Sequence, residues 1–276
     1  MNKETERDIA LDGRTRIKSL FLDYDGTIGP LNVPREESRV PDKTLSTLEK
    51  ISRLIPIVII STKDLPFLVP RTPFAHAWCG IAGIETMIGN KVEQPPFLED
   101  ALERVTSAFE YAKSTAKDAD VFLEEKHDSL GRTVAFCVDW RCAKDLETAK
   151  LQASLIENRC IELRLDVLNY ARQPFFDVYP IPVDKGGAVK DVRGKLGLED
   201  GTLYMGDSEI DNPAFRACNV SLGVINEETN RQNLACEFFV TSGEVESFLT
   251  MLLENHLFFD PNFPMIKTNP SRMGES

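Results

Sequence analysis

The sequence predicts an α/β protein built on a parallel sheet, with a smaller α+β module inserted into it. Short, wholly apolar runs alternate with amphipathic stretches in the first and last thirds of the chain, the pattern of strand–helix–strand units with parallel strands. Between these parts, strands are joined to one another by a turn and by helices, which favours an α+β module. We place its borders near Asn90 and Pro182, where Pro and Gly cluster. The predicted domains are residues 1–89 with 183–276, and residues 90–182 as the insertion.

The first segment of the parallel domain contains three predicted strands and a helix. Residues 17–22 have the length of a strand and end in the apolar run Leu20-Phe21-Leu22, and residues 55–60 are a β-branched run typical of a strand buried on both faces. Between them, residues 43–54 carry apolar side chains on one stripe at helical spacing, which predicts a helix. Residues 78–82 are a third short strand.

The remaining elements follow from the same patterns. In the insertion we predict helices over residues 98–116 and 143–158 and strands over residues 121–125, 133–140, 161–167 and 175–179. In the last segment we predict helices over residues 185–196, 213–217 and 244–254, strands over residues 203–205, 219–224 and 237–240, and an irregular tail from Phe259.

Composition excludes several classes of function. The 276 residues carry a net charge of −12, which argues against a general binder of nucleic acid or of anionic membranes. A small phosphorylated substrate is still compatible, because it needs only a local positive site. Six cysteines without a C-x-x-C pair make a zinc site or a disulfide framework unexpected. The charged start lacks the apolar region of a signal peptide, and no run reaches transmembrane length, so we expect a cytoplasmic protein.

Two carboxylates end the first predicted strand. Side chains alternate along a strand, so Asp23 and Asp25 project to the same side while Tyr24 turns away. Adjacent acids repel each other unless a cation lies between them, or unless one is a nucleophile and the other carries a proton. Gly26 then allows the chain to turn in a conformation closed to most residues. Alone, the pattern could also be a solvated acidic turn.

Three further sites follow predicted strands. Ser61 follows a buried strand, where it could hold phosphate or simply cap a helix. Lys185 opens a helix, where it could bind an anion at the helix N-terminus or lie in solvent. Asp207 and Asp211 form a second acid pair or an acidic cap. With the first pair, these sites make four motifs at the carboxyl ends of strands, the edge where α/β sheets bind ligands, and the catalytic interpretation is favoured.

The four motifs carry a resemblance to a known family. Asp23-Tyr24-Asp25-Gly26-Thr27 resembles the first motif of the haloacid dehalogenase (HAD) superfamily of phosphohydrolases, Asp-x-Asp-Gly-Thr. The resemblance implies a Rossmann-like parallel-sheet core with an inserted α+β cap of type C2. Within that branch the chain is similar to trehalose-6-phosphate phosphatases in two stretches, Glu124-Glu125-Lys126 and the run from Asp177 to Gly186.

The resemblance implies a role for each core motif. Asp23 would attack phosphorus and form an aspartyl-phosphate, and Asp25 would protonate the leaving oxygen and then activate water. Mg²⁺ would be held by Asp23, the main-chain carbonyl of Asp25, and Asp207. The residues expected to bind the substrate phosphate are Ser61, Thr62, Lys185, Gly26 and Thr27; those expected to support the site are Asp211, which would orient Lys185, and Ser208.

The insertion offers two candidates for sugar recognition. Glu124 and Lys126 lie two apart on a predicted strand and would share a face, from which they could reach the hydroxyls of a sugar. The alternative is an ordinary solvated surface.

The chain departs from the trehalose-6-phosphate phosphatases at several motif positions. The family has Ser-Gly-Arg where this chain has Ser61-Thr62-Lys63, and an Arg where it has Tyr179. Its His-Gly appears as Ala82-Gly83, and the acidic third-motif run continues differently after Asp207. Because none of these changes removes a catalytic group, they bear on which sugar is bound.

We therefore expect a Mg²⁺-dependent phosphatase acting on a small phosphorylated sugar through an aspartyl-phosphate, without a nucleic-acid or membrane partner. Two alternatives keep the fold: a phosphosugar mutase, which would need a second phosphate site in the cap, and a phosphatase of another small monoester. A third is a non-catalytic phosphosugar-binding regulator, against which the intact Asp23 and Asp25 count. The sequence identifies neither the sugar nor the oligomeric state.

Overall fold

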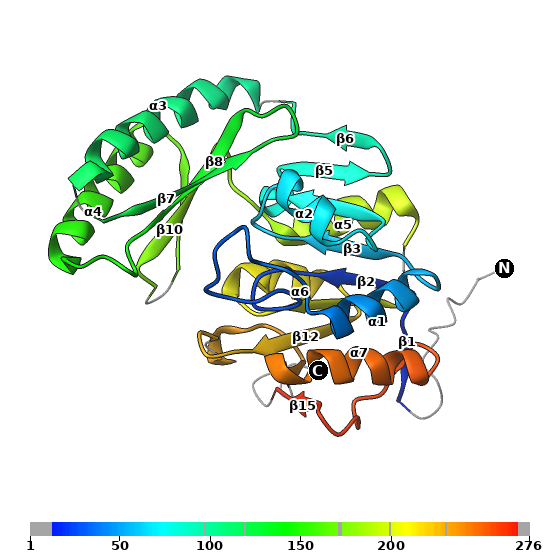
Figure 1. Ribbon diagram of the computed structural model, residues 1–276. Coiled ribbons are helices and arrows are strands. Elements are labelled where there is room, and N and C mark those ends of the chain that lie inside the picture. The colour runs from blue at the N-terminus through cyan, green and yellow to red at the C-terminus, as the bar shows by residue number, and fades with distance from the viewer. Residues whose placement is uncertain are drawn as a thin grey trace. The chain divides into compact units, whose positions relative to one another are not determined.

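A computed structural model describes residues 13–96, 98–118, 120–170, 173–198, 200–229 and 231–269. The chain divides into two compact units, whose segments can be found in Figure 1 by their residue numbers on the colour bar. The core unit comprises the chain up to Thr62, Leu68–Gly83, and the chain from Asp184. The inserted unit comprises Lys63–Phe67 and Ile84–Val183. The predicted domain borders stay a prediction, because packing alone does not show which segments fold on their own.

The main sheet has nine strands in the order β15-β13-β12-β11-β2-β3-β4-β5-β6. Strand β2 is central, and its four side chains are fully buried. It pairs in parallel with β11 and β3, and the parallel pairing continues to β12, β13 and β4. The bounds are β2 Ser19–Leu22, β3 Ile57–Ile60, β4 Ala77–Gly80, β5 Glu85–Ile88, β6 Lys91–Glu93, β11 Thr202–Gly206, β12 Val220–Ile225, β13 Phe238–Thr241 and β15 Lys267–Thr268.

The helices of the core unit pack in pairs, α1 against α7 and α5 against α6 (Figure 1). Helix α1 buries Leu48 and Ile51, and α7 buries Phe248, Leu249 and Leu252. Both helices thus present one apolar stripe, as amphipathic helices on a sheet do. The α-helices of the first and last segments of the chain are α1 Asp42–Ser52, α2 Leu65–Arg71, whose first three residues belong to the inserted unit, α5 Lys185–Leu196, α6 Asn212–Ala217 and α7 Val245–Glu254.

The inserted unit contains a four-stranded antiparallel sheet in the order β7-β8-β10-β9. One face packs against α3 and α4 through an apolar core, in which the rings of Phe109 and Phe136 lie 5.2 Å apart. Because side chains alternate along strands, polar residues such as Glu124 and Lys126 occupy the other face. The bounds are α3 Glu99–Thr115, β7 Phe122–His127, β8 Thr133–Asp139, α4 Leu146–Glu162, β9 Asp166–Asn169 and β10 Phe175–Tyr179.

The structure confirms most predicted elements and differs at a few. The strand predicted over residues 161–167 begins only at Asp166, because α4 continues to Glu162, buries Cys160, and ends before a turn in which Arg164 has a φ of +56°. The sequence analysis missed α2, which carries prolines in its first turn and near its end. It also missed the β5–β6 hairpin, whose turn contains Gly89 with φ +58°.

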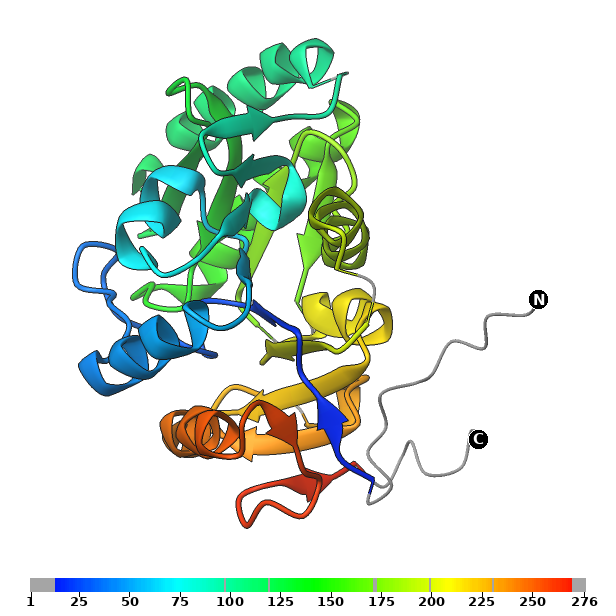
Figure 2. The ribbon, with the colours of Figure 1, turned by 90° about the vertical axis from the view of Figure 1, so that its right-hand side faces the viewer.

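The tail is more regular than predicted. Strand β14, Phe258–Phe259, pairs antiparallel with β1, Thr15–Arg16, so a segment after α7 lies beside the first described strand (Figure 2). Strand β15 pairs with β13, which extends the main sheet by one edge strand.

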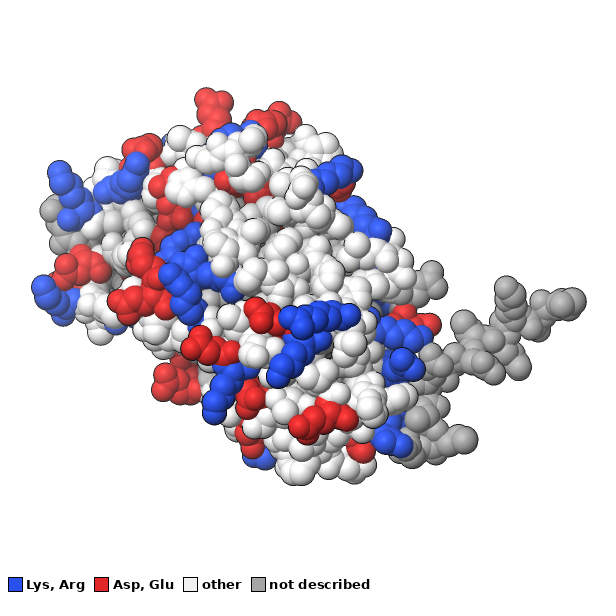
Figure 3. All heavy atoms as spheres, turned by 45° about the vertical axis from the view of Figure 1, so that its right-hand side comes forward, with Lys and Arg blue, Asp and Glu red and all other residues white. Residues whose placement is uncertain are grey.

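Charges of both signs occur side by side on the face drawn in Figure 3. Within the described ranges, no helix combines the length and the apolar character needed to cross a membrane.

Candidate active site

Asp23 lies directly after the central strand β2, at the carboxyl edge of the sheet. Its backbone N–H donates to the carbonyl of Met205 in β11 at 2.9 Å, which fixes its position. The Lys185 ammonium, at the start of α5, lies 2.9 Å from Asp23 Oδ1 and 2.6 Å from Asp211 Oδ1. Lys185 is only 1% exposed, so this cation is held entirely by the two carboxylates. The strands thus bring together residues far apart in the sequence.

Asp211 is the hydrogen-bond centre of the site. Its Oδ1 accepts from Lys185 and from the Tyr204 hydroxyl at 2.6 Å. Its Oδ2 accepts from the backbone N–H groups of Asp207 and Ser208, both at 3.1 Å, and from the Ser208 hydroxyl at 3.3 Å. Because both oxygens are engaged, Asp211 is suited to orienting Lys185, as the sequence predicts, and Ser208 supports it.

Asp207 follows β11 and is held by a residue that the sequence analysis missed. The Asn226 amide donates to Asp207 Oδ2 at 2.7 Å and lies 3.4 Å from the Gly26 carbonyl. Asn226 directly follows β12. In the sequence, the one feature that points to it is its place as a polar residue at the end of a buried strand. Gly26 has a φ of +71°, and a Cβ there would overlap the Asp207 carboxylate. Glycine is therefore required both by the turn and by the close approach of Asp207.

The electrostatics of the site reflect a concentration of buried negative charge. Burial raises the pKa of Asp23 to about 7, with Lys185 opposing and Asp211 adding to the shift. Burial, and then Asp23 and Asp211, raise the pKa of Asp207 well above its usual range. Burial lowers the pKa of Lys185, but the charges of Asp211 and Asp23 outweigh it and raise that pKa overall. One ammonium thus faces three carboxylates.

The donor set fits a hard divalent cation. Oxygen atoms of Asp23, Asp207 and Asp211 all lie within 4.8 Å of one another. Asp211 is occupied by donors, whereas Asp23 accepts from Lys185 and Asp207 from Asn226 through one oxygen each. Their remaining lone pairs are the carboxylate ligands that Mg²⁺ takes in proteins. A cation there would also offset the burial and the repulsion between carboxylates that together raise the pKa values of Asp23 and Asp207.

The other predicted core residues lie at the same sheet edge. Ser61, 1% exposed, follows β3, and its N–H donates to the Cys79 carbonyl at 3.0 Å. Thr62 comes next and is partly exposed. Asp25, also partly exposed, lies in the turn after β2, where the Tyr24 carbonyl accepts the N–H of Thr27. The Thr27 hydroxyl is buried and has no hydrogen-bond partner among the described residues.

In the inserted unit both predicted recognition residues are already paired. Lys126 is 3% exposed, and its ammonium lies 2.5 Å from Asp177 Oδ1. The hydroxyls of Tyr170 and Tyr179 donate to Asp177 Oδ2 at 2.7 and 3.2 Å. Burial lowers the pKa of Lys126, but Asp177 outweighs it and raises the pKa overall.

Glu124 accepts from the Lys63 ammonium at 2.9 Å. Trehalose-6-phosphate phosphatases have an arginine at the position of Lys63. In this chain the lysine at that position forms an ion pair with Glu124, which lies in the same unit.

Known proteins resemble this chain in sequence and in fold. No family model matches the chain. A probable trehalose-phosphate phosphatase C from Arabidopsis thaliana is 23% identical over 255 residues, which cover 85% of this chain and 76% of that protein. A solved trehalose-6-phosphate phosphatase related protein superposes with a TM-score of 0.69 at 19% identity, covering 87% of this chain and 98% of that one. The C-terminal domain of the C. albicans trehalose-6-phosphate phosphatase gives 0.68 at 19% identity, covering 87% and 94%.

A HAD subclass IIB sugar phosphatase superposes with a TM-score of 0.57 at 14% identity, covering 87% of this chain and 99% of that one. The chain therefore has the fold of HAD phosphatases, an α/β core with an inserted α+β module, which confirms the fold class expected from the motifs. Among its relatives in sequence are plant trehalose-phosphate phosphatases, in agreement with the resemblance drawn above.

Proposed function

We propose that this protein is a Mg²⁺-dependent phosphatase that hydrolyses a phosphorylated sugar through an aspartyl-phosphate. The observation that supports the proposal is a pair of buried ion pairs at the carboxyl edge of a parallel sheet: Lys185 contacts both Asp23 and Asp211, and Asp207 lies beside them. Two of the relatives are named trehalose-phosphate phosphatases, and a structural neighbour is a HAD sugar phosphatase. Both support a sugar monophosphate as the substrate class.

Asp23 is proposed as the nucleophile. One of its oxygens attacks phosphorus while the bond from phosphorus to the sugar oxygen breaks, and Asp25 gives that oxygen its proton. Asp25 then takes a proton from water, which attacks the aspartyl-phosphate and releases inorganic phosphate with free Asp23. The ammonium of Lys185, 2.9 Å from Asp23 Oδ1, favours the ionised form of the nucleophile against the effect of burial and faces the incoming phosphate.

The remaining core residues are proposed to hold the phosphate and the metal. Mg²⁺, bound by Asp23, the Asp25 carbonyl and Asp207, would neutralise negative charge on the phosphate. The hydroxyls of Ser61 and Thr62 would bind its oxygens together with Lys185, and Gly26 and Thr27 would form the loop that borders the phosphate. Asp211 and Ser208 would position Lys185.

Glu124 and Lys126 are proposed to recognise the sugar. Their contacts with Lys63 and Asp177 mean that each would present a paired, and so positionally fixed, group. A carboxylate and an ammonium that are held by partners lose less side-chain entropy when a sugar hydroxyl binds.

The test is phosphate release from a panel of sugar phosphates that includes trehalose 6-phosphate, with Mg²⁺ and with EDTA. We expect Mg²⁺-dependent release that falls about 10³-fold or more in Asp23→Asn, since a nucleophile is lost. Asp191→Asn, a carboxylate on the exposed part of α5, is the matched control and should retain activity. Folded wild-type protein that releases phosphate from no substrate would contradict the proposal. Transfer of phosphate between positions of the sugar, without release, would indicate a mutase instead.

A further inference from the structure

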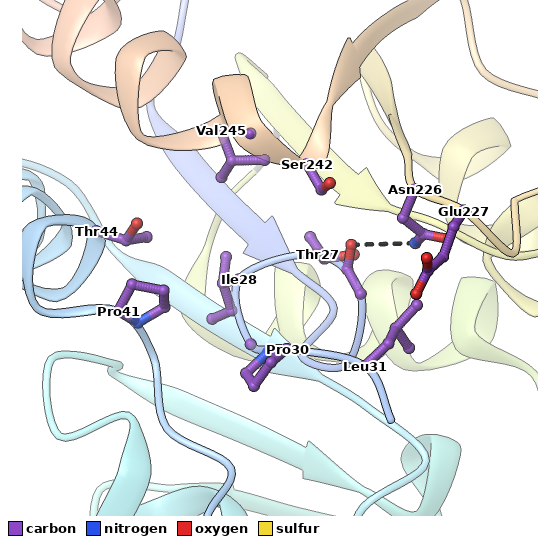
Figure 4. Close-up of a pocket in the computed structure, with 13 residues that line it drawn as sticks. Thr27, Ile28, Pro30, Leu31, Pro41, Thr44, Asn226, Glu227, Ser242 and Val245 are labelled. Carbon is purple, nitrogen blue, oxygen red and sulfur yellow. Dashed lines mark hydrogen bonds between the residues drawn. The ribbon is translucent and has the colours of Figure 1, made fainter. Parts of the chain in front are cut away.

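A pocket of about 480 Å³ lies within the core unit, beside the loop that follows β2 (Figure 4). It is lined by that loop from Gly26 to Leu31, by Asn226 and Glu227 after β12, and by residues at the starts of α1 and α7. Asp23, Lys185, Asp207 and Asp211 are not among its lining residues. Its volume is in the range of small-molecule sites. The pocket is therefore a cavity next to the candidate active site rather than part of the acidic cluster.

The pocket offers unsatisfied hydrogen-bonding capacity. Thr27 is 4% exposed, lines the pocket, and its hydroxyl has no partner in the described part of the chain. A buried hydroxyl without a partner is destabilising, and a hydrogen bond to a ligand hydroxyl would remove that cost. The Asn226 amide, the Ser242 hydroxyl and the Glu227 carboxylate line the same space and can also bond to hydroxyls.

The charge of the lining limits the ligand. Glu227 is the one ionisable side chain among the described residues that line the pocket, which include no Lys, Arg or His. A phosphate or carboxylate would meet no positive charge there and would be repelled by Glu227. The apolar part of the lining, from Ile28, Leu31 and Val245, suits the C–H faces of a ring. The combination of apolar walls and several hydroxyl-binding groups matches a neutral polyhydroxylated molecule.

We propose that this pocket binds a neutral, unphosphorylated sugar at a site separate from the acidic cluster. Asn226 links the two places, because the same amide that lines the pocket donates to Asp207 Oδ2 at 2.7 Å. The inference does not rest on the proposed catalysis, since binding can be measured without turnover.

The test is calorimetric titration of the full chain with trehalose and with glucose, neither of which carries a phosphate that the protein could hydrolyse. Two variants probe the pocket. Thr27→Val removes the hydroxyl at constant shape. Gly243→Leu adds bulk at the rim, where an added Cβ meets no atom within 4 Å. Gly194→Leu makes the same change at an open glycine in α5 and is the matched control. Thermal melts identify any variant that fails to fold.

We expect saturable binding of at least one of the two sugars, weakened about fivefold or more by each pocket variant and unchanged in Gly194→Leu. Inorganic phosphate should not displace the sugar. The proposal is overturned if neither sugar binds, if folded Thr27→Val and Gly243→Leu bind as tightly as wild type, or if inorganic phosphate competes. Phosphate release by Gly243→Leu, measured separately with Mg²⁺, should be unaffected, so failure of binding and failure of catalysis are distinguishable.

Discussion

Asp23 is a carboxylate whose surroundings oppose its own ionisation. It is 5% exposed, and Asp207 and Asp211 lie close to it, so that Lys185 only partly offsets the cost of its charge. A pKa of about 7 means that the folded protein without metal holds a proton there that the unfolded chain releases near pH 4. Such a group destabilises the metal-free fold at neutral pH, and a bound cation removes that cost.

The first prediction follows from the sign of this shift. A carboxyl with a raised pKa contributes stability that is fully present below about pH 4 and is lost as the pH rises through 7. In EDTA, wild type should therefore lose up to about 4 kcal/mol between pH 4 and pH 8 that Asp23→Asn does not lose, since one pKa unit corresponds to about 1.4 kcal/mol. Urea unfolding at several pH values measures the difference.

Asp191→Asn is the control for this comparison, because its exposed side chain lies outside the site. Parallel pH profiles of wild type and Asp23→Asn would show that burial does not govern the ionisation of Asp23.

Individual site residues could be predicted from the sequence where they belong to a short motif at the end of a predicted strand or the start of a predicted helix. Asp23, Lys185, Asp207 and Asp211 each follow an apolar run or open a helix, and the structure brings the four together. Asn226 could not be predicted with the same force, because a single amide after a strand has no spacing pattern.

The ion pair between Lys126 and Asp177 could not be predicted from the sequence either. Asp177 lies 51 residues from Lys126, and which side chains share a face across strands depends on register.

Among the elements, the loop from Asp25 to Gly29 brings the chain after β2 close to Asp207, which follows β11. The Tyr24 carbonyl accepts the N–H groups of Thr27, Ile28 and Gly29, which closes the chain into a tight turn. The turn places Gly26 against Asp207, so the positive φ of Gly26 and the absence of a side chain are both needed. The loop is thus a structural condition for the acid pair.

The second prediction concerns this loop. Gly26→Ala should displace Asp207 and abolish the rise in melting temperature caused by Mg²⁺, with phosphate release reduced about 100-fold by misplacement of the reacting groups. A strained backbone adds about 1–3 kcal/mol of destabilisation. Thermal melts with and without Mg²⁺ measure the loss of stability and the response to the metal, and a phosphate-release assay measures the activity. Gly243→Ala, where an added Cβ meets no atom within 4 Å, is the control. An unchanged Mg²⁺ response in Gly26→Ala would show that Asp207 does not depend on the loop.

Elements were predictable where local composition decides them. The β-branched run in β3 was recognised because burial on both faces of a strand leaves a clear pattern. Helix α2 was missed because its two prolines resemble a loop, although Asp64 accepts the Phe67 N–H at its start. The pair β1–β14 was missed because two-residue strands exist only through tertiary pairing.

For the whole molecule, the division into two units separates the acidic site from the sheet that carries Lys126. All the described ligand candidates lie in the core unit. The two tryptophans of the chain are divided between the units: Trp78 lies in β4 of the core unit, and Trp140 packs 6.0 Å from Phe176 in the inserted unit. Each can therefore report on the unfolding of its own unit.

The third prediction uses these reporters. A ligand that binds only the folded state stabilises it by about 2.7 kcal/mol at a hundredfold excess over its dissociation constant. In Trp140→Phe, where Trp78 alone fluoresces, Mg²⁺ should raise the urea midpoint. In Trp78→Phe, where Trp140 alone fluoresces, the shift should be smaller. Equal shifts would mean that both units unfold as one cooperative body.

The central claim is that Asp23 becomes phosphorylated during turnover, and chemical trapping tests it most directly. The protein is mixed with Mg²⁺ and with a sugar phosphate that it hydrolyses. The reaction is quenched in acid and reduced with borohydride, which converts an aspartyl-phosphate into homoserine. Peptide mass mapping should find homoserine at position 23 only when substrate and Mg²⁺ are both present, and nowhere in Asp23→Asn. Turnover without modification at position 23, or homoserine at Asp25 in its place, would contradict the account.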